Sequence, residues 1–98
     1  MNLPVVLRAE AEAEFDRAFD WYEAHRAGLG AEFAAEVQRV FDRVAANPLI
    51  HGIAMPDVRK AAVRRFPYCV YYRPQSDRIE VVAVFHTSRD PAVWQGRN

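Results

Sequence analysis

Two stretches in the first half of the chain repeat their apolar residues at the spacing of an amphipathic helix. A short apolar run at residues 4–7 precedes them and predicts a strand. The apolar positions of the two helical stretches are Ala11, Phe15, Ala18, Phe19 and Tyr22, followed by Phe33, Val37, Val40, Phe41 and Val44. Gly28-Leu29-Gly30 interrupts the pattern and Asn47-Pro48 ends it. A connection of about three residues makes the two predicted helices an antiparallel hairpin.

The second half changes to the alternating pattern of β-strands. Residues 48–56 are rich in Pro and Gly and predict a loop. Strands are predicted at about 58–66, 68–73 and 78–86, with a turn at 74–77. The fold class is therefore α+β, in one domain over residues 1–98. It has an N-terminal strand, an antiparallel α-hairpin and then a three-stranded antiparallel meander, in the order β-α-α-β-β-β.

Alternation assigns the strand residues to two faces of the sheet. The first face is apolar and is expected to pack on the helices; it comprises Ala61, Val63, Val70, Tyr72, Ile79, Val81, Ala83 and Phe85. The second has an apolar centre and cationic margins; it comprises Lys60, Ala62, Arg64, Cys69, Tyr71, Arg73, Val82, Val84 and His86. Because no further segment is predicted to cover the second face, we expect it to be open and to bind a partner. The alternative is a small amphipathic face without a partner.

Composition narrows the class of protein. Hydrophobic residues make up 51% of the chain, enough for a core without disulfides. Cys69 is the single cysteine and the three histidines are far apart in sequence, so we expect neither a disulfide framework nor a metal site, and no motif indicates a cofactor. The N-terminus lacks the pattern of a signal peptide, and no apolar run approaches the ~18 residues of a membrane span. We therefore expect a cytoplasmic protein that does not contact membranes.

Charge is divided between the two halves of the chain. Residues 1–50 carry five Arg and nine Asp or Glu, a net charge of −4, whereas residues 51–98 carry eight Lys or Arg and four Asp or Glu, a net charge of +4. The basic half is expected to contact an anionic partner; the alternative is that these are simply solvated helix and strand charges. A net charge of zero argues against strong nonspecific binding to nucleic acid.

A polar cluster follows the last predicted strand. His86 ends that strand, and Arg89, Asp90 and Trp94 come soon after it. Polar residues placed where a sheet ends often carry function; the alternative for His86 is a structural role in hydrogen-bonding the C-terminal turn. A Ser-His-Asp chain of Ser88, His86 and Asp90 is excluded, because residues so close in sequence do not form that geometry.

Several motifs, in this order, give the chain a family resemblance. They are Ala18-Phe19-Asp20-Trp21-Tyr22, Gly28-Leu29-Gly30, Arg64-Arg65-Phe66-Pro67-Tyr68, Val70-Tyr71-Tyr72 and Phe85-His86 with Arg89-Asp90-Pro91 and Trp94. Together they cover nearly the whole chain, which resembles the RelE/ParE superfamily of type II toxin–antitoxin toxins. The resemblance implies a small toxin that a cognate antitoxin neutralises.

The resemblance also separates two branches of this superfamily. RelE-like members cut messenger RNA on the ribosome with a basic set of residues, whereas ParE-like members are associated with poisoning DNA gyrase. By register, two RelE-type lysines fall on Lys60 and Ala62, an arginine falls on Cys69, a later arginine on Arg89 and a tyrosine near Trp94. Since Ala62, Cys69 and Trp94 replace the expected residues, the resemblance favours a ParE-like toxin without catalysis.

Specific contacts follow from this interpretation. The target-binding residues are predicted to be Arg59, Arg64, Arg65, His86, Arg89 and Trp94. The antitoxin-binding residues are predicted to be Trp21, Tyr71, Val82 and Val84. For Trp21 the alternative is a core position that widens the apolar stripe of the first helix. The implied partners are a ParD-like antitoxin in a hetero-oligomer and DNA gyrase as target, with DNA contacted only through the antitoxin; the implied role is plasmid stabilisation. Two alternatives stay open: a ribosome-dependent endoribonuclease using Lys60, Arg64, His86 and Arg89, and a non-toxic antitoxin-binding module.

Overall fold

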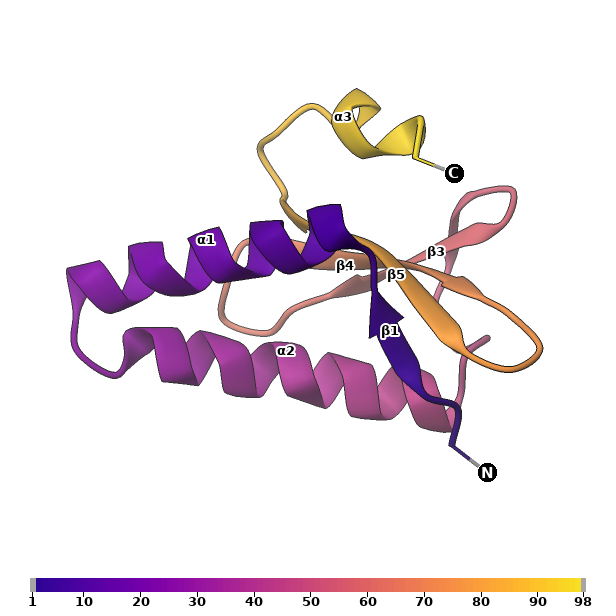
Figure 1. The fold of residues 1–98 in the computed structure, drawn as a ribbon, viewed down its shortest axis with the longest axis horizontal. Coiled ribbons are helices and arrows are strands. Elements are labelled where there is room, and N and C mark those ends of the chain that lie inside the picture. The colour runs from indigo at the N-terminus through magenta and orange to yellow at the C-terminus, as the bar shows by residue number, and fades with distance from the viewer. Residues whose placement is uncertain (1, 98) are drawn as a thin grey trace.

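Two long helices form the hairpin that the apolar spacing predicts. The computed structural model describes residues 2–97. Helix α1 spans Ala9–His25 and helix α2 spans Leu29–Ala46. Figure 1 shows them side by side and antiparallel, with the short C-terminal helix α3 (Ala92–Gln95) set apart from both. The predicted α-hairpin is confirmed.

The glycines between the helices have two separate roles. Gly28 has a φ of 88°, in the left-handed region that favours glycine. A Cβ on Gly30 would come within 2.9 Å of the Phe19 carbonyl oxygen, so the second glycine permits close contact between the helices. The Glu23 carboxylate accepts hydrogen bonds from the N–H groups of Gly28 and Gly30, each at 2.9 Å. Glu23 thus satisfies two donors at the start of α2 that have no partner within that helix.

The sheet has five strands, two more than the predicted meander. The strands are β1 (Val5–Leu7), β2 (Ile53–Met55), β3 (Val58–Ala62), β4 (Tyr68–Pro74) and β5 (Ile79–His86), in the spatial order β1-β5-β4-β3-β2. The meander of β3, β4 and β5 is antiparallel, as predicted, but β1 joins β5 in parallel. The α+β class is confirmed, and the sheet is mixed rather than wholly antiparallel.

Two strand boundaries differ from prediction. Residues 53–55, predicted as loop, form the short edge strand β2. The strand predicted at 58–66 ends at Ala62, because Arg65 has a φ of 70° and the chain turns there.

A β-bulge in β5 corrects the predicted faces of the sheet. Tyr71 pairs with Ala83 and Tyr72 pairs with Val81, so Val82 is an extra residue on β5. Beyond the bulge the alternation shifts by one residue. Val84 therefore lies on the helix face, whereas Ala83 and Phe85 lie on the second face. The predicted face was wrong for these three residues and for His86, which pairs with Tyr68 of the helix face, because regular alternation cannot reveal a bulge.

The second face of the sheet is covered by the chain itself, which contradicts the predicted open surface. Trp94 is 1% exposed and its ring lies 4.1 Å, between centroids, from that of Tyr71. The same buried cluster contains Cys69, Val82 and Phe85. The sequence prediction failed because no local pattern indicates that residues 87–97 fold back and place an indole on the strands.

A buried carboxylate fixes the end of the C-terminal segment. Glu14 on α1 is 6% exposed, and its two oxygens accept hydrogen bonds from the Arg97 guanidinium at 2.8 and 3.1 Å. One of these oxygens also accepts the Val84 N–H on β5 at 3.1 Å, and Arg97 donates to the Val82 carbonyl oxygen at 3.0 Å. Glu14 thereby joins α1, β5 and the C-terminal segment.

Residues 2–97 contain no helix long and apolar enough to cross a membrane. Within the same range, no group of three or more His, Cys, Asp or Glu side chains could hold a metal ion.

Candidate functional site

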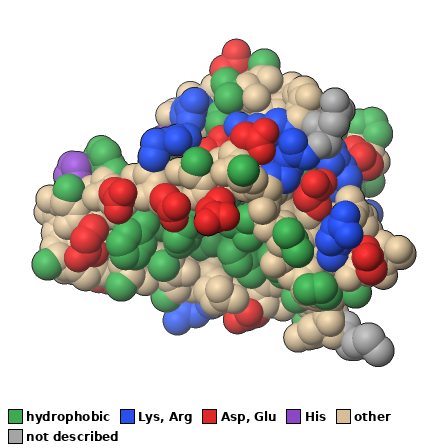
Figure 2. Space-filling model, viewed as in Figure 1, with side chains coloured by type: hydrophobic (Ala, Val, Ile, Leu, Met, Phe, Trp, Pro, Cys, Tyr) green, Lys and Arg blue, Asp and Glu red, His purple; other side chains and the backbone are tan. Residues whose placement is uncertain are grey.

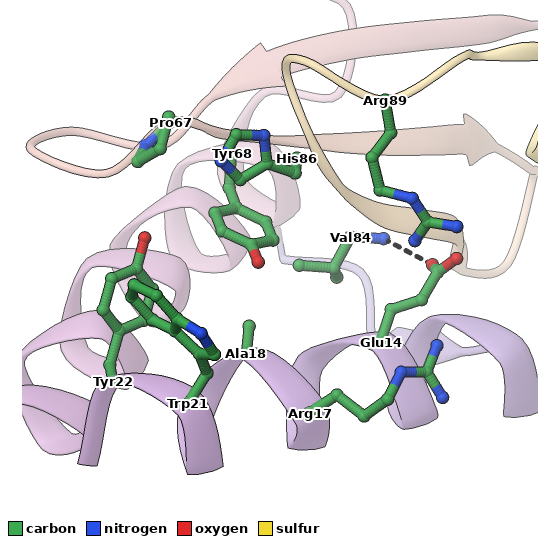
Figure 3. A pocket seen from close by; sticks show the side chains of 10 residues that line it. All are labelled: Glu14, Arg17, Ala18, Trp21, Tyr22, Pro67, Tyr68, Val84, His86 and Arg89. Carbon is green, nitrogen blue, oxygen red and sulfur yellow. Dashed lines mark hydrogen bonds between the residues drawn. The ribbon is translucent and has the colours of Figure 1, made fainter. Parts of the chain in front are cut away.

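An open pocket lies between α1 and the end of the sheet where β5 finishes and β4 begins. Its volume is about 510 Å³. We call it the α1–β5 pocket; it is lined by Glu14, Arg17, Ala18, Trp21, Tyr22, Pro67, Tyr68, Val84, His86 and Arg89 (Figure 3). It gathers residues from α1, both central strands and the loop after β5.

One end of the α1–β5 pocket is aromatic and exposed. Trp21 is 57% exposed, although it lies next to the buried Tyr22 on α1. Consecutive helical residues are turned about 100° from each other, so Trp21 projects beside the stripe that faces the core. Its indole stacks on His25 at 3.7 Å and meets Tyr22 edge-on at 5.1 Å. An indole held in place but open to water is typical of an interaction anchor.

His86 and Tyr68 form the opposite wall. They are paired residues on β5 and β4, so their rings meet edge-on at 5.1 Å. The Ser88 N–H donates to His86 Nδ1 at 3.1 Å, and the Ser88 hydroxyl lies 2.8 Å from the same nitrogen. Because a backbone N–H can only donate, Nδ1 is an acceptor here and the proton of the neutral ring lies on Nε2. His86 therefore offers a donor rather than a free base in this arrangement.

Two arginines face the Tyr68 side of the pocket. Burial raises the pKa of Tyr68 above its ordinary value of 10.0, and the charges of Arg89 and Arg17 oppose that rise. In Figure 3, Arg89 reaches down from the loop after β5 toward Glu14, and Arg17 lies on α1 beside Glu14. The Arg89 guanidinium also lies 4.6 Å from the centroid of the Phe85 ring. The Tyr68 hydroxyl is therefore protonated at neutral pH, and it lies near the charges of Arg89 and Arg17.

Raised tyrosine pKa values predict a loss of stability in alkali. Burial raises the pKa of Tyr22, Tyr68, Tyr71 and Tyr72 above 10.0, and that of Cys69 above 9.0. The unfolded chain then releases these protons at lower pH than the folded chain. The free energy of unfolding is therefore expected to hold below about pH 9 and to fall as the pH rises further.

Urea denaturation at about pH 8 and pH 10.5, followed with tyrosinate absorbance, checks this expectation. Equal free energies of unfolding at the two pH values would contradict it.

The predicted target-binding residues are separated by the fold. His86 and Arg89 line the α1–β5 pocket, and Arg64 is exposed in the turn between β3 and β4. Arg59 donates to the carbonyl oxygens of His51 and Leu49, at 2.7 and 3.4 Å.

Two further members of that predicted set are engaged within the chain. Arg65 pairs with Glu32 at 2.8 Å. Trp94 is buried, so its predicted exposure to a target was wrong, because its ring covers the sheet.

The predicted antitoxin-binding residues are also divided. Trp21 is exposed at the α1–β5 pocket. Tyr71 and Val82 are buried in the cluster that contains Trp94, and Val84 is buried on the helix face, where it forms part of the pocket floor. The open face that motivated the choice of Tyr71, Val82 and Val84 is not present in this structure.

Two residues of the nuclease alternative, Lys60 and His86, do not converge. Lys60 pairs with Tyr71, whose side chain belongs to the second-face cluster. His86 pairs with Tyr68, which packs against the helix-face core. Directly paired residues share a face, so Lys60 and His86 point to opposite faces of the sheet. They cannot act on one phosphodiester.

Sequence reasoning missed four residues of this region: Glu14, Arg17, Tyr68 and Arg97. A signal existed for Glu14, because it follows Ala11 by three residues and precedes Ala18 by four, on the buried stripe of α1. Arg17 precedes Trp21 by four residues and so shares its side of the helix. Nothing in the local pattern indicates that Arg97 contacts α1.

Comparisons with known proteins agree with this architecture. The family model of the ParE toxin of type II toxin–antitoxin systems, parDE, matches residues 5–91. A solved chain described as the chromosomal ParDE toxin–antitoxin system from P. aeruginosa superposes with a TM-score of 0.75 at 16% sequence identity. That superposition covers 88% of this chain and 97% of the other. No curated protein matches the sequence.

Proposed function

Because the chain belongs to the ParE toxin family of type II toxin–antitoxin systems, we propose that it is a toxin that binds and inhibits DNA gyrase. It acts in the cytoplasm, and a ParD-like antitoxin neutralises it in a hetero-oligomer. The proposed target contacts are His86 and Arg89 at the α1–β5 pocket, together with the exposed Arg64. DNA is contacted only through the antitoxin, since the toxin itself has a net charge of zero.

Inhibition by binding is supported by the arrangement of the polar side chains. Cleavage of RNA needs a base for the 2′-hydroxyl, an acid for the leaving oxygen and cations for the developing charge, all at one phosphodiester. Lys60 and His86 lie on opposite faces of the sheet, and His86 Nδ1 already accepts from Ser88. The pocket instead offers an exposed indole and two guanidinium groups, which suit protein recognition.

Expression of the toxin without its antitoxin tests this function. We expect growth to stop, plasmid supercoiling to change and messenger RNA to stay intact. Arg89→Ala should relieve the effect, with binding to purified gyrase weakened about tenfold or more. Arg78→Ala is the matched control, because Arg78 is exposed in the turn at the far end of β5.

Three outcomes would contradict the proposal. Cleavage of transcripts by the wild-type toxin that is lost in the His86→Ala variant would indicate the nuclease. Normal growth at high expression would indicate the non-toxic module. Full inhibition by the Arg89→Ala variant would exclude the pocket as the contact with the target.

A further inference from the structure

Two cations of the α1–β5 pocket, Arg17 and Arg89, form no salt bridge among the residues that the structure describes. Seven of the twelve arginines of residues 2–97 lie within 3.5 Å of a carboxylate oxygen: Arg8, Arg26, Arg39, Arg65, Arg73, Arg78 and Arg97. Arg43, Arg59 and Arg64, which lie outside the pocket, form no salt bridge in that range. The acidic residue between Arg17 and Arg89, Glu14, is already engaged by Arg97 and the Val84 N–H. The pocket therefore has positive charge available for an anionic group.

The remainder of the pocket is apolar. Ala18, Tyr22 and Val84 are buried, and the half-exposed ring of Trp21 forms the aromatic end (Figure 3). A volume of about 510 Å³ falls within the range of sites that enclose a ligand group. An apolar floor with cations at one end fits a large apolar side chain that has a carboxylate close to it in sequence.

We propose that the antitoxin occupies this pocket with such a segment. One aromatic or branched aliphatic side chain lies on Ala18, Val84 and Trp21, and an Asp or Glu nearby in sequence lies between Arg17 and Arg89. This inference rests on the proposed function, which supplies the antitoxin, and it names the chemistry by which the antitoxin is recognised. The antitoxin then covers the proposed target contacts His86 and Arg89, so it neutralises the toxin by blocking access of the target to these residues.

Charge on α1 distinguishes a peptide from a nucleic acid. The exposed side of α1 carries Glu12, Asp16 and Asp20, and Figure 2 shows acidic side chains in a row along this helix, above a hydrophobic band. A polyanion crossing the helix would be repelled by these carboxylates, whereas a single carboxylate held between two guanidinium groups is not. The observations therefore favour an acidic peptide over RNA.

Reversal of the two charges tests the inference. Arg17→Glu and Arg89→Glu toxins are titrated with the antitoxin encoded beside the toxin gene, and each is expected to bind about tenfold or more weakly than wild type. Arg78→Glu is the control and should bind normally. Intrinsic fluorescence gives a second readout. Trp94 is already buried, so a blue shift on binding reports the covering of Trp21 and should be absent in Trp21→Ala.

A charge exchange makes the test specific. Antitoxin variants, each with one Asp or Glu replaced by Lys, are screened for binding to the Arg17→Glu and Arg89→Glu toxins. One of these lysine variants should restore binding. The inference would be overturned if both arginine variants fold and bind the antitoxin with wild-type affinity. It would also be overturned if a single-stranded RNA 12-mer binds the toxin through both arginines and the antitoxin does not displace it. Failure of the proposed function is separable. A wild-type toxin that binds antitoxin through these arginines but does not affect gyrase or growth would refute the function and leave this inference standing.

Discussion

Replacement of Glu14 with alanine is expected to lower the free energy of unfolding by about 3–4 kcal/mol. The side chain is buried, and its removal leaves the Val84 N–H without an acceptor and the partly buried Arg97 guanidinium without its carboxylate partner. Loss of one partner of a buried ion pair is typically worth about 3–5 kcal/mol. We take the lower part of that range, because Arg97 lies near the end of the chain and can turn toward water.

Urea denaturation measures this effect, with Glu12→Ala as control because Glu12 is exposed on the same helix. The control should change stability by less than about 0.5 kcal/mol. Glu14→Gln should lie between the two, because the amide oxygen can still accept from Val84 but carries no charge for Arg97. Equal stability of Glu14→Ala and Glu12→Ala would show that the Glu14 contacts do not hold the fold together.

Replacement of Trp94 with alanine is expected to cost about 3 kcal/mol and to uncover the second face of the sheet. The indole is 1% exposed and lies on Tyr71, so its loss removes a large buried aromatic side chain. α3 has only four residues and is too short to be stable without tertiary contacts. Tyr71, Val82 and Phe85 should then be reached by water.

Urea denaturation and binding of the dye ANS report the two consequences. The control is Val93→Ala, because Val93 is the exposed neighbour of Trp94 in α3. We expect the Trp94 variant to bind ANS in its native baseline and the control to bind none. A Trp94→Ala protein with wild-type stability and no ANS binding would show that the second face is covered by something other than this side chain.

The fold could be predicted from sequence wherever local periodicity carries it. The two helices follow from apolar spacing, and the break between them follows from Gly28 and Gly30, whose roles are steric. The parallel pairing of β1 with β5 could not be predicted, because the sequence of a three-residue strand does not indicate which strand it pairs with. The bulge at Val82 also left no trace in the alternation, and it exchanged the faces of the residues that follow.

The site could be predicted only in part. His86 and Arg89 follow from the polar cluster at the end of the last strand and Trp21 from the predicted antitoxin contacts, and all three line the pocket. Trp94 was selected for a surface role and is buried, because whether a tail aromatic folds back depends on contacts distant in sequence. Arg17 stands among acidic residues in the sequence, and only the structure shows that it lines the pocket and forms no salt bridge within residues 2–97.

Hydrogen exchange of the toxin, measured with and without its antitoxin, tests most directly whether the antitoxin binds at the α1–β5 pocket. We expect slower exchange at residues 14–22 and 84–89, which supply most of the α1–β5 pocket, and no change in β3 or at residues 92–97. Protection of residues 58–62 and 69–73, with faster exchange at 92–97, would instead show that the antitoxin displaces Trp94 and binds the second face of the sheet.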